Sequence, residues 1–343
     1  MSRLSVVMLT GSFPPERCGV GDYTEKLLQA LKRLGIKVNL VTGHRWNLLA
    51  LKDISERVYQ SRSSLVHIQY PTVGYGAGLA PHALCLSCRS PVIVTLHEFA
   101  SGHLLRRLSC LGFSLRSDHL IFPTEAERTA FCRLGRVRRE RSSVIPVGSN
   151  IPALTGPETR NGRICFFGLL VPKQSLRDFL RLVRLCHERA TGYEFEIIGS
   201  SPREKRYQGF VDSLKRENSG LPIRWRTDLS PADVATALSD ISYAYLPYPD
   251  GASLRRGSLL AALSNGVAVV TTDSAMRPAG LEKAVRFASD PEHALAVFME
   301  LKSAPDITSK MSCEGKIFSK QFDWNTIAQR HFDLYVRVLA MHH

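Results

Sequence analysis

The chain has 343 residues, of which 44% are hydrophobic, and a formal net charge of +14. This length predicts two domains, and the hydrophobic fraction excludes an intrinsically disordered protein. No stretch reaches the roughly 20 apolar residues of a membrane-spanning helix, and the short apolar run at the N-terminus lacks the small-residue cleavage site of a signal peptide. We therefore expect a cytoplasmic protein.

The positive charge is concentrated in the first half. Residues 1–157 hold 20 Lys and Arg against 10 Asp and Glu, whereas residues 158–343 hold 25 against 21. Nucleic acid, an anionic membrane surface and a phosphate-bearing substrate all have the complementary sign. Nucleic acid is disfavoured, because the sequence has no recognition motif and no interleaved aromatic platform.

Short apolar strands alternate with helices along the first half. The strands are predicted at Leu4–Leu9, Val38–Val41, Leu65–Ile68, Val92–Leu96, Leu120–Phe122 and Val144–Ile145, and the helices at Tyr23–Leu34 and Glu125–Arg133. Fully apolar strands separated by helices are typical of a parallel sheet covered on both faces. The first half is therefore predicted to be a doubly wound α/β domain.

A polar segment rich in Pro and Gly, residues 150–163, interrupts this pattern, which then restarts. The second set of strands is predicted at Ile164–Phe167, Phe195–Ile198, Ile223–Trp225, Ile241–Leu246 and Ala268–Thr271, and the helices at Leu176–Arg189, Tyr207–Glu217, Pro231–Leu238 and Ser258–Ser264. Two similar α/β halves joined by one linker predict a ligand in the cleft between them.

A loop with two glycines, Gly19 and Gly21, follows the first strand and precedes a helix expected from Asp22 or Tyr23. Glycines let the backbone approach a ligand, and a helix N-terminus attracts phosphate. The spacing lacks the third glycine of a dinucleotide fingerprint, which disfavours a nicotinamide oxidoreductase. A tight turn capped by Asp22 is the alternative interpretation.

His97 directly follows a predicted strand, at the end where parallel sheets bind ligands. A histidine there can donate to a sugar hydroxyl or to a phosphate. A histidine whose needs are met within the protein, or one on the surface, is the alternative.

In the second half, Gly168 ends the first strand and Lys173 lies in the loop after it, within FFGLLVPKQ. A lysine in this loop can pair with a diphosphate as a compact charge. Solvent exposure is the alternative for an isolated loop lysine.

A cluster of cationic and small residues precedes an apolar helix in the stretch 246–274. Arginines and a serine at a helix N-terminus combine charge, helix dipole and backbone N–H groups into an anion site. The residues concerned are Arg255, Arg256, Gly257 and Ser258. Arginine at a helix start opposes the macrodipole, so its presence there indicates an anion, although a solvated pair of arginines remains the alternative.

The only C-x-x-C pair, Cys85 and Cys88, lacks the second pair that a zinc site needs, and we expect two partly buried thiols. Two basic stretches remain, residues 103–116 and residues 133–141. The first alternates leucine with arginine as a helix on an anionic membrane surface does, and the second could contact anionic head groups or a lipid diphosphate. A packed or solvated helix face is the alternative for both.

In their order and spacing these motifs resemble glycosyltransferase family 4, the retaining enzymes of GT-B architecture. The resemblance runs from FPPERCGVGDYTEKLLQAL through the His97–Glu98 pair, IPVGSNI, FFGLLVPKQ and EFEIIGS to DGASLRRGSLLAALSNGVAVVTT and the closing FDWNTIAQRHFDLY. It implies two Rossmann-like domains that face each other across a cleft. The expected domains are residues 1–155 on the acceptor side, residues 163–322 on the nucleotide-sugar donor side, and residues 323–343 as a C-terminal helix that packs back on the first domain.

The resemblance also implies residue roles. Gly19 and Gly21 would border the donor diphosphate and the acceptor, and His97 would contact the transferred sugar. Lys173 would hold the diphosphate, and the remaining donor-site residues would be Gly168, Ser253, Arg255, Arg256, Gly257 and Ser258. His97, Lys173 and Arg256 are the expected catalytic residues.

Two positions depart from the family pattern. Leu169 stands where the family has arginine, and Ser253 and Ala261 align with a glutamate pair whose second member holds the ribose hydroxyls. Arg255 or Arg256 would replace the missing arginine.

The implied activity is hexosyl transfer from a nucleotide-diphosphate sugar with retention of configuration, in polysaccharide or glycolipid biosynthesis. No cofactor is expected, and the absence of a D-x-D motif suits a metal-independent enzyme. The expected partners are the nucleotide sugar, an acceptor saccharide or lipid-linked saccharide, and an anionic inner membrane surface bound through the basic first domain. A catalytically inactive binding subunit and a nucleotide-sugar epimerase are the alternatives.

Overall fold

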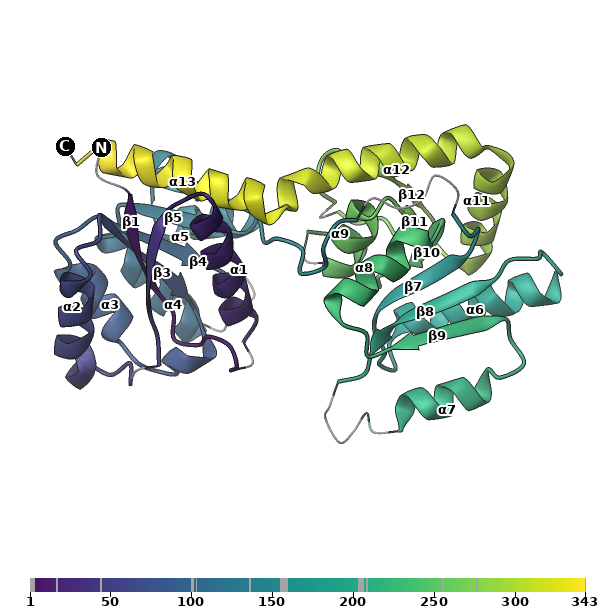
Figure 1. Ribbon diagram of the computed structural model, residues 1–343, viewed down its shortest axis with the longest axis horizontal. Helices are drawn as coiled ribbons and strands as arrows, with labels where there is room; N and C mark the ends of the chain where they lie inside the picture. Colours follow the sequence, from purple (N-terminus) through teal and green to yellow (C-terminus); the bar gives the residue numbers. More distant parts are fainter. Residues whose placement is uncertain are drawn as a thin grey trace. The chain divides into compact units, whose positions relative to one another are not determined.

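The computed structural model describes residues 4–16, 18–43, 45–99, 102, 104–135, 137–154, 160–202, 207, 209–254, 256–275 and 277–342. The chain divides into two compact units (Figure 1). Unit 1 consists of Met1–Gly148 and Phe322–His343, and unit 2 consists of Ser149–Gln321. Each unit contains one six-stranded, fully parallel sheet with helices on it, so the predicted fold class is confirmed.

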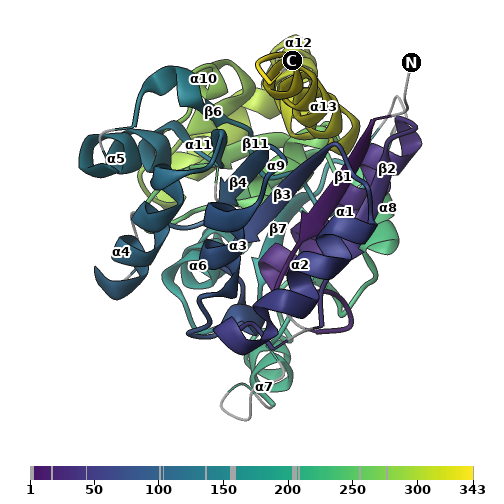
Figure 2. The same cartoon turned by 90° about the vertical axis from the view of Figure 1, so that its left-hand side faces the viewer.

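The sheet of unit 1 has the order β2-β1-β3-β4-β5-β6, and Figure 2 shows β1, β3 and β4 side by side. The strands are β1 (Ser5–Leu9), β2 (Lys37–Val41), β3 (Leu65–Tyr70), β4 (Val92–Leu96), β5 (His119–Phe122) and β6 (Ser142–Val144). The helices are α1 (Gly19–Arg33), α2 (Leu51–Gln60), α3 (Ala80–Ser87), α4 (Leu104–Gly112), α5 (Glu125–Gly135) and α13 (Trp324–Ala340), with short 3-10 turns η1 (Leu48–Ala50), η2 (Val73–Tyr75), η3 (Phe113–Leu115) and η4 (Arg139–Arg141).

Alternate side chains of β1 enter two different cores, because successive residues of a strand point to opposite faces. Val6 and Met8 pack with α1 and α13 on one face of the sheet. Val7 and Leu9 pack with helices α2 to α5 on the other face. Helix α13, which follows unit 2 in the sequence, therefore completes the core of unit 1.

Two local features hold α13 in place. Asp323 caps the helix by accepting hydrogen bonds from the backbone N–H groups of Asn325 and Thr326, at 2.8 and 3.2 Å. In the loop that follows β6, Gly148 lies against the indole of Trp324, and a Cβ added to Gly148 would come within 2.6 Å of the ring. A side chain at position 148 would displace the start of the helix.

The sheet of unit 2 has the order β12-β11-β10-β7-β8-β9. The strands are β7 (Ile164–Leu169), β8 (Phe195–Ser200), β9 (Ile223–Thr227), β10 (Tyr243–Leu246), β11 (Ala268–Thr271) and β12 (Val285–Phe287). The helices are α6 (Gln174–Glu188), α7 (Phe210–Glu217), α8 (Pro231–Asp240), α9 (Gly257–Ser264), α10 (Leu281–Ala284), α11 (Pro291–Ser303) and α12 (Pro305–Ser319), and the turn η6 (Lys320–Phe322) leads back to unit 1.

Strand order in unit 2 sets the place of a ligand site. The chain proceeds from β7 to β8 and β9 on one side, and then returns to place β10 on the other side of β7. Loops therefore diverge at the carboxyl ends of β7 and β10, which is the switch point where open α/β sheets bind ligands. The face opposite α8 and α9 is covered by α6 and α11, with Phe179 and Phe298 fully buried against the sheet.

Candidate functional site

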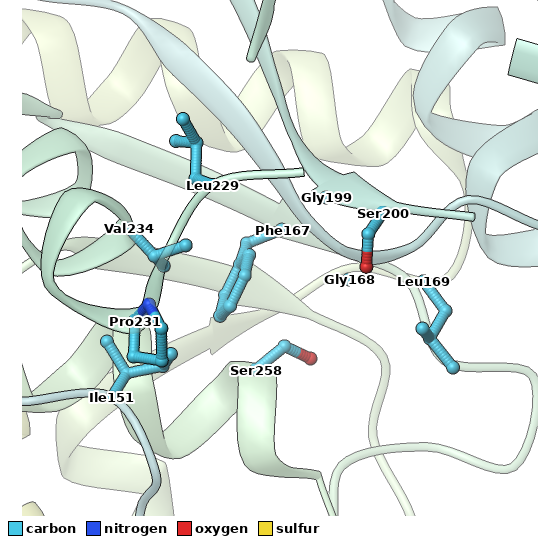
Figure 3. Close-up of a pocket in the computed structure, with 10 residues that line it drawn as sticks. All are labelled: Ile151, Phe167, Gly168, Leu169, Gly199, Ser200, Leu229, Pro231, Val234 and Ser258. Atoms are coloured by element: carbon cyan, nitrogen blue, oxygen red, sulfur yellow. The ribbon is translucent and has the colours of Figure 1, made fainter. Parts of the chain in front are cut away.

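A cavity of about 340 Å³ opens at this switch point, wholly within unit 2 (Figure 3). It is lined by the ends of β7 and β8, by the start of α8 and by the first turn of α9. The lining residues are Ile151, Phe167, Gly168, Leu169, Gly199, Ser200, Leu229, Pro231, Val234 and Ser258. Its wall is mostly apolar, with two serine hydroxyls and exposed backbone, which is the usual character of a small-molecule site.

Two glycines make the floor of this cavity. Gly168 and Gly199 are partners in the parallel pairing of β7 and β8. A Cβ built on Gly199 would lie 2.1 Å from the carbonyl oxygen of Gly168, so no side chain fits there. The strand ends consequently present backbone to the cavity and leave room for a ligand to approach closely.

The first turn of α9 forms the opposite wall. Ser258 lines the cavity, and its hydroxyl lies 2.8 Å from the hydroxyl of Tyr248. Gly257 is exposed, and the space around its missing Cβ is open to 4 Å. The first backbone N–H groups of a helix have no partner within the helix, so this turn can bind an anion.

Arg256 occupies the N-cap position of α9. Its guanidinium lies over the ring of Tyr248, 4.7 Å from the centroid, and pairs with the exposed carboxylate of Asp250. Its Nε is buried without a hydrogen-bond partner. The arginine is thus held beside the helix start with donor capacity left over.

The structure brings some of the predicted donor residues together and leaves others apart. Gly168 and Ser258 line the same cavity. Ser253 is half-buried, and its carbonyl accepts a hydrogen bond from the backbone N–H of Arg256 at 3.1 Å. Lys173 is exposed at the N-cap of α6, outside the lining of the cavity. Arg255 lies outside the described residues.

In unit 1, His97 directly follows β4, and its backbone N–H donates to the carbonyl of Tyr70 at 2.8 Å. The half-buried ring contacts Gln69 through Nε2, at 2.8 Å from Oε1, and packs edge-on against Tyr23 with centroids 4.6 Å apart. Burial, with a smaller contribution from His331, lowers the pKa of His97 to about 3. His97 is therefore neutral at physiological pH.

The prediction of a glycine loop before α1 is wrong in one respect. The helix begins at Gly19, so both glycines lie in its first turn, and Cys18 rather than Asp22 is the N-cap. A Cβ on Gly21 would lie 3.0 Å from the carbonyl oxygen of Ser12. Gly21 therefore permits close packing of α1 on the loop after β1, whereas the space around Gly19 is open.

Several functional candidates were absent from the sequence-based prediction. Gly199 and Ser200 belong to the motif EFEIIGS, whose glycine at a strand end is the signal that could have identified them. Gln69 and His331 carried no such signal, because their contacts with His97 and Tyr23 come from other strands and from the far end of the chain.

The remaining motifs of the sequence have simple structural settings. Cys85 is buried in α3, Cys88 is its C-cap, and both are free thiols. Burial raises the pKa of Cys85 to about 12. In the part of the chain that the structure describes, no three or more His, Cys, Asp or Glu side chains form a group that could hold a metal ion.

The model of Glycosyltransferase Family 4 matches residues 43–151, within unit 1. No curated protein matches the sequence significantly.

Many solved structures share the fold over the whole chain. A glycosyltransferase from Rickettsia africae has a TM-score of 0.73 at 12% identity, with 99% of both chains covered. HepE from Anabaena, solved in complex with UDP, has a TM-score of 0.69 at 14% identity, with 97% of this chain and 100% of the other covered. Sucrose-phosphate synthase from Thermosynechococcus elongatus has a TM-score of 0.68 at 14% identity, with 99% and 100% covered.

At these identities the similar structures establish the fold, and the family model supplies the sequence match. Together they support the resemblance: the chain has the GT-B fold, and residues 43–151 match the model of Glycosyltransferase Family 4.

Proposed function

We propose that the protein transfers a sugar from a nucleotide-diphosphate sugar to an acceptor hydroxyl, with the nucleotide bound in the cavity of unit 2. The observation that carries this proposal is the combination of paired strand-end glycines with an open helix N-terminus around one cavity at the switch point. The apolar wall suits a base and ribose, and the first turn of α9 suits the phosphates. HepE, a structure of the same fold, binds UDP, so a uridine diphosphate sugar is our first candidate donor.

The diphosphate is the leaving group, and its growing charge is what the protein must stabilise. Arg256 can exchange its ion pair with the exposed Asp250 for a phosphate, and we assign Lys173, at the exposed start of α6, to the same diphosphate. With the first N–H groups of α9, these cations supply the stabilisation without a metal ion. We assign His97 to the transferred sugar, and retention of configuration follows from the family resemblance.

The position that aligns with the family's ribose-binding glutamate cannot make that contact. Ala261 is fully buried in α9. We infer that Ser200 and Ser258, the two serines on the cavity wall, contact the ribose in its place. This arrangement favours an active enzyme over an inactive binding subunit, since a polar lining is retained where the glutamate is lost.

A screen of nucleotide sugars by thermal shift tests the donor site, because a ligand that binds only the folded state raises its stability. We expect a uridine diphosphate sugar to raise the melting temperature and Lys173→Ala and Arg256→Ala to reduce that rise. Unchanged donor affinity in both variants would refute the diphosphate assignment. Product analysis with and without an acceptor distinguishes transfer from epimerisation, and absence of any turnover of a bound donor would favour the inactive subunit.

The acceptor side of the proposal places the enzyme at an anionic membrane, in polysaccharide or glycolipid biosynthesis. No helix in the described part of the chain could cross a membrane. Helix α4, however, buries Cys110 and exposes leucines on the opposite side: Leu104 at 69%, Leu105 at 74% and Leu108 at 54%. Apolar side chains on a surface helix in a domain with a net charge of +10 are typical of an interfacial helix.

The second basic stretch contributes less to such a surface. Arg139 pairs with Glu125, and Arg141 donates to the carbonyl of Ser117. Flotation with vesicles of phosphatidylglycerol and phosphatidylcholine tests the assignment to α4. We expect Leu105→Glu to abolish flotation and Leu49→Glu, at a leucine 92% exposed on η1, to leave it intact. Flotation that does not depend on the content of anionic lipid would refute the membrane assignment.

A further inference from the structure

The side chain behind His97 is a buried amide. Gln69, on β3, has no exposed surface, and its Oε1 lies 2.8 Å from Nε2 of His97. Its amide nitrogen lies 3.2 Å from the sulfur of Met8 and 3.2 Å from Nε2 of His67. Gln69 thus connects His97 to the interior of unit 1.

The contact with Met8 fixes which way this amide points. A thioether sulfur has no hydrogen and can only accept, so the NH₂ group must face it. The amide oxygen therefore faces His97. Because this oxygen can only accept, Nε2 of His97 must carry a hydrogen.

Among the described residues, the groups that shift the pKa of His97 all disfavour a second proton on its ring. The neighbours are Tyr23 from α1, Gln69 and His67 from β3, and His331 from α13, none of which is an anion. Burial, together with a smaller contribution from His331, lowers the pKa of His97 to about 3. A neutral imidazole has one hydrogen, which is already at Nε2, so Nδ1 keeps its lone pair. Among the described residues, Nδ1 has no hydrogen bond of its own.

We propose that Gln69 holds His97 in the Nε2–H tautomer, so that His97 binds its substrate through Nδ1 as an acceptor from a hydroxyl group. Phosphate oxygens at neutral pH only accept hydrogen bonds, so a lone pair at Nδ1 repels them. His97 therefore selects a sugar hydroxyl and not a phosphate. Gln69 is a positioning residue in this scheme, which rests on the proposed function for the assignment of His97 to the sugar.

The position of the ring depends on the C-terminal helix as well. His331 lies in α13, and its Nδ1 lies 2.8 Å from the carbonyl of Ile327, so Nδ1 donates and Nε2 accepts. Nε2 lies 3.4 Å from the hydroxyl of Tyr23, whose ring packs on His97. These successive contacts hold the ring of Tyr23 in place, and the ring of Tyr23 in turn fixes the position of His97.

Nitrogen-15 NMR of the full chain with labelled histidine reads the tautomer directly. We expect the His97 signals, identified by their loss in His97→Gln, to show a protonated Nε2 and a bare Nδ1 from pH 5 to pH 8. Gln69→Leu removes the acceptor and should mix the two tautomers. A protonated Nδ1 in the wild-type protein would overturn the proposal, whether or not the enzyme turns over any donor.

The pH profile of kcat/KM gives a second test. Gln69→Glu keeps an acceptor oxygen but adds an anion, which raises the pKa of His97 and puts a hydrogen on Nδ1 as the pH falls. We expect this variant to lose activity on the acid side, where the wild type shows no titration of His97. Gln60→Glu, which adds the same charge at the exposed end of α2, is the matched control. Identical profiles for the two variants would contradict the proposal.

Donor analogues that each lack one sugar hydroxyl identify the group bound. One such analogue should bind about 10-fold more weakly than the parent to the wild type, as expected for a lost hydrogen bond, and equally well to His97→Ala. If no analogue distinguishes wild type from variant, His97 does not accept from a hydroxyl. Failure of the proposed function itself would appear differently, as the absence of binding by every nucleotide sugar.

Discussion

The carboxyl edges of the two sheets are built on the same plan and are filled in opposite ways. In unit 1, the ends of β3 and β4 hold large polar side chains, Gln69 and His97, which hydrogen-bond to each other. In unit 2, the ends of β7 and β8 hold the paired glycines Gly168 and Gly199 and leave a cavity of about 340 Å³. One edge presents a single oriented side chain, and the other presents backbone and space. In the proposed function the first edge selects one functional group, whereas the second edge holds the nucleotide.

The largest expected difference between the two units is in their stability at acidic pH. Burial lowers the pKa of His331 and of His119, both in unit 1, from 6.5 to about 4. The unfolded chain then binds more protons between pH 6.5 and pH 4, so stability is lost as the pH falls through this window. At pH 5, each of these two histidines should lower the free energy of unfolding by about 2 kcal/mol relative to neutral pH. In unit 2, burial raises the pKa of Glu196, an effect of the opposite sign.

We therefore expect unit 1 to unfold at a higher pH than unit 2. Trp46 and Trp324 report on unit 1, and Trp225 reports on unit 2. Acid titrations of variants that keep only one of these reporters would measure the two transitions separately. A unit 2 transition at the higher pH would contradict the comparison.

The next largest effect is expected at the pair of glycines that forms the floor of the cavity in unit 2. Gly199→Ala places a Cβ 2.1 Å from the carbonyl oxygen of Gly168, so the strand ends must separate. We expect a loss of about 1–3 kcal/mol in the free energy of unfolding and weaker nucleotide binding, measured by urea denaturation and by thermal shift. Gly220→Ala is the control, because a Cβ there meets open space and the residue is exposed. Equal stability of the two variants would show that the glycine pair is not required.

Arg256→Ala should weaken nucleotide binding by about 10-fold, the effect of one charge-assisted hydrogen bond. Arg277→Ala is a close control, because Arg277 also pairs with an aspartate, Asp273, and also lies over a ring, that of Phe287. Both variants lose an ion pair and a cation–π contact, so their stabilities should change alike. Calorimetry should show weaker nucleotide binding for Arg256→Ala only. An equal loss of affinity in both variants would show that Arg256 does not belong to the donor site.

The smallest effect is expected for Tyr23→Phe in unit 1. The change removes the 3.4 Å contact with His331 but keeps the ring that packs on His97. We expect a loss of about 1 kcal/mol in stability and little change in nucleotide affinity, since the proposed nucleotide site lies in unit 2. A large loss of nucleotide affinity would mean that the two sites are coupled.

Much of the secondary structure was predictable because it depends on local pattern. Buried parallel strands are continuous apolar runs, and the predicted strands from 4–9 to 268–271 all correspond to strands of the two sheets. The start of α1 was misjudged by about a turn, because glycines at 19 and 21 indicate a loop in the sequence. In the structure both lie in the first turn of the helix, and Gly21 packs against Ser12. Helices α11 and α12 follow the last motif of the second half, residues 246–274, and were not predicted.

The sequence by itself determined the two α/β halves, the strand ends at which Gly168 and His97 lie, and the start of α9 to within one residue, because period, apolar runs and glycine positions act over a few residues. Tertiary structure alone decided which residues meet. Gly199 closes on Gly168, and His331 reaches Tyr23 across 308 positions of the chain. Such contacts depend on how strands align and how a distant helix returns to the sheet, and no local pattern encodes them.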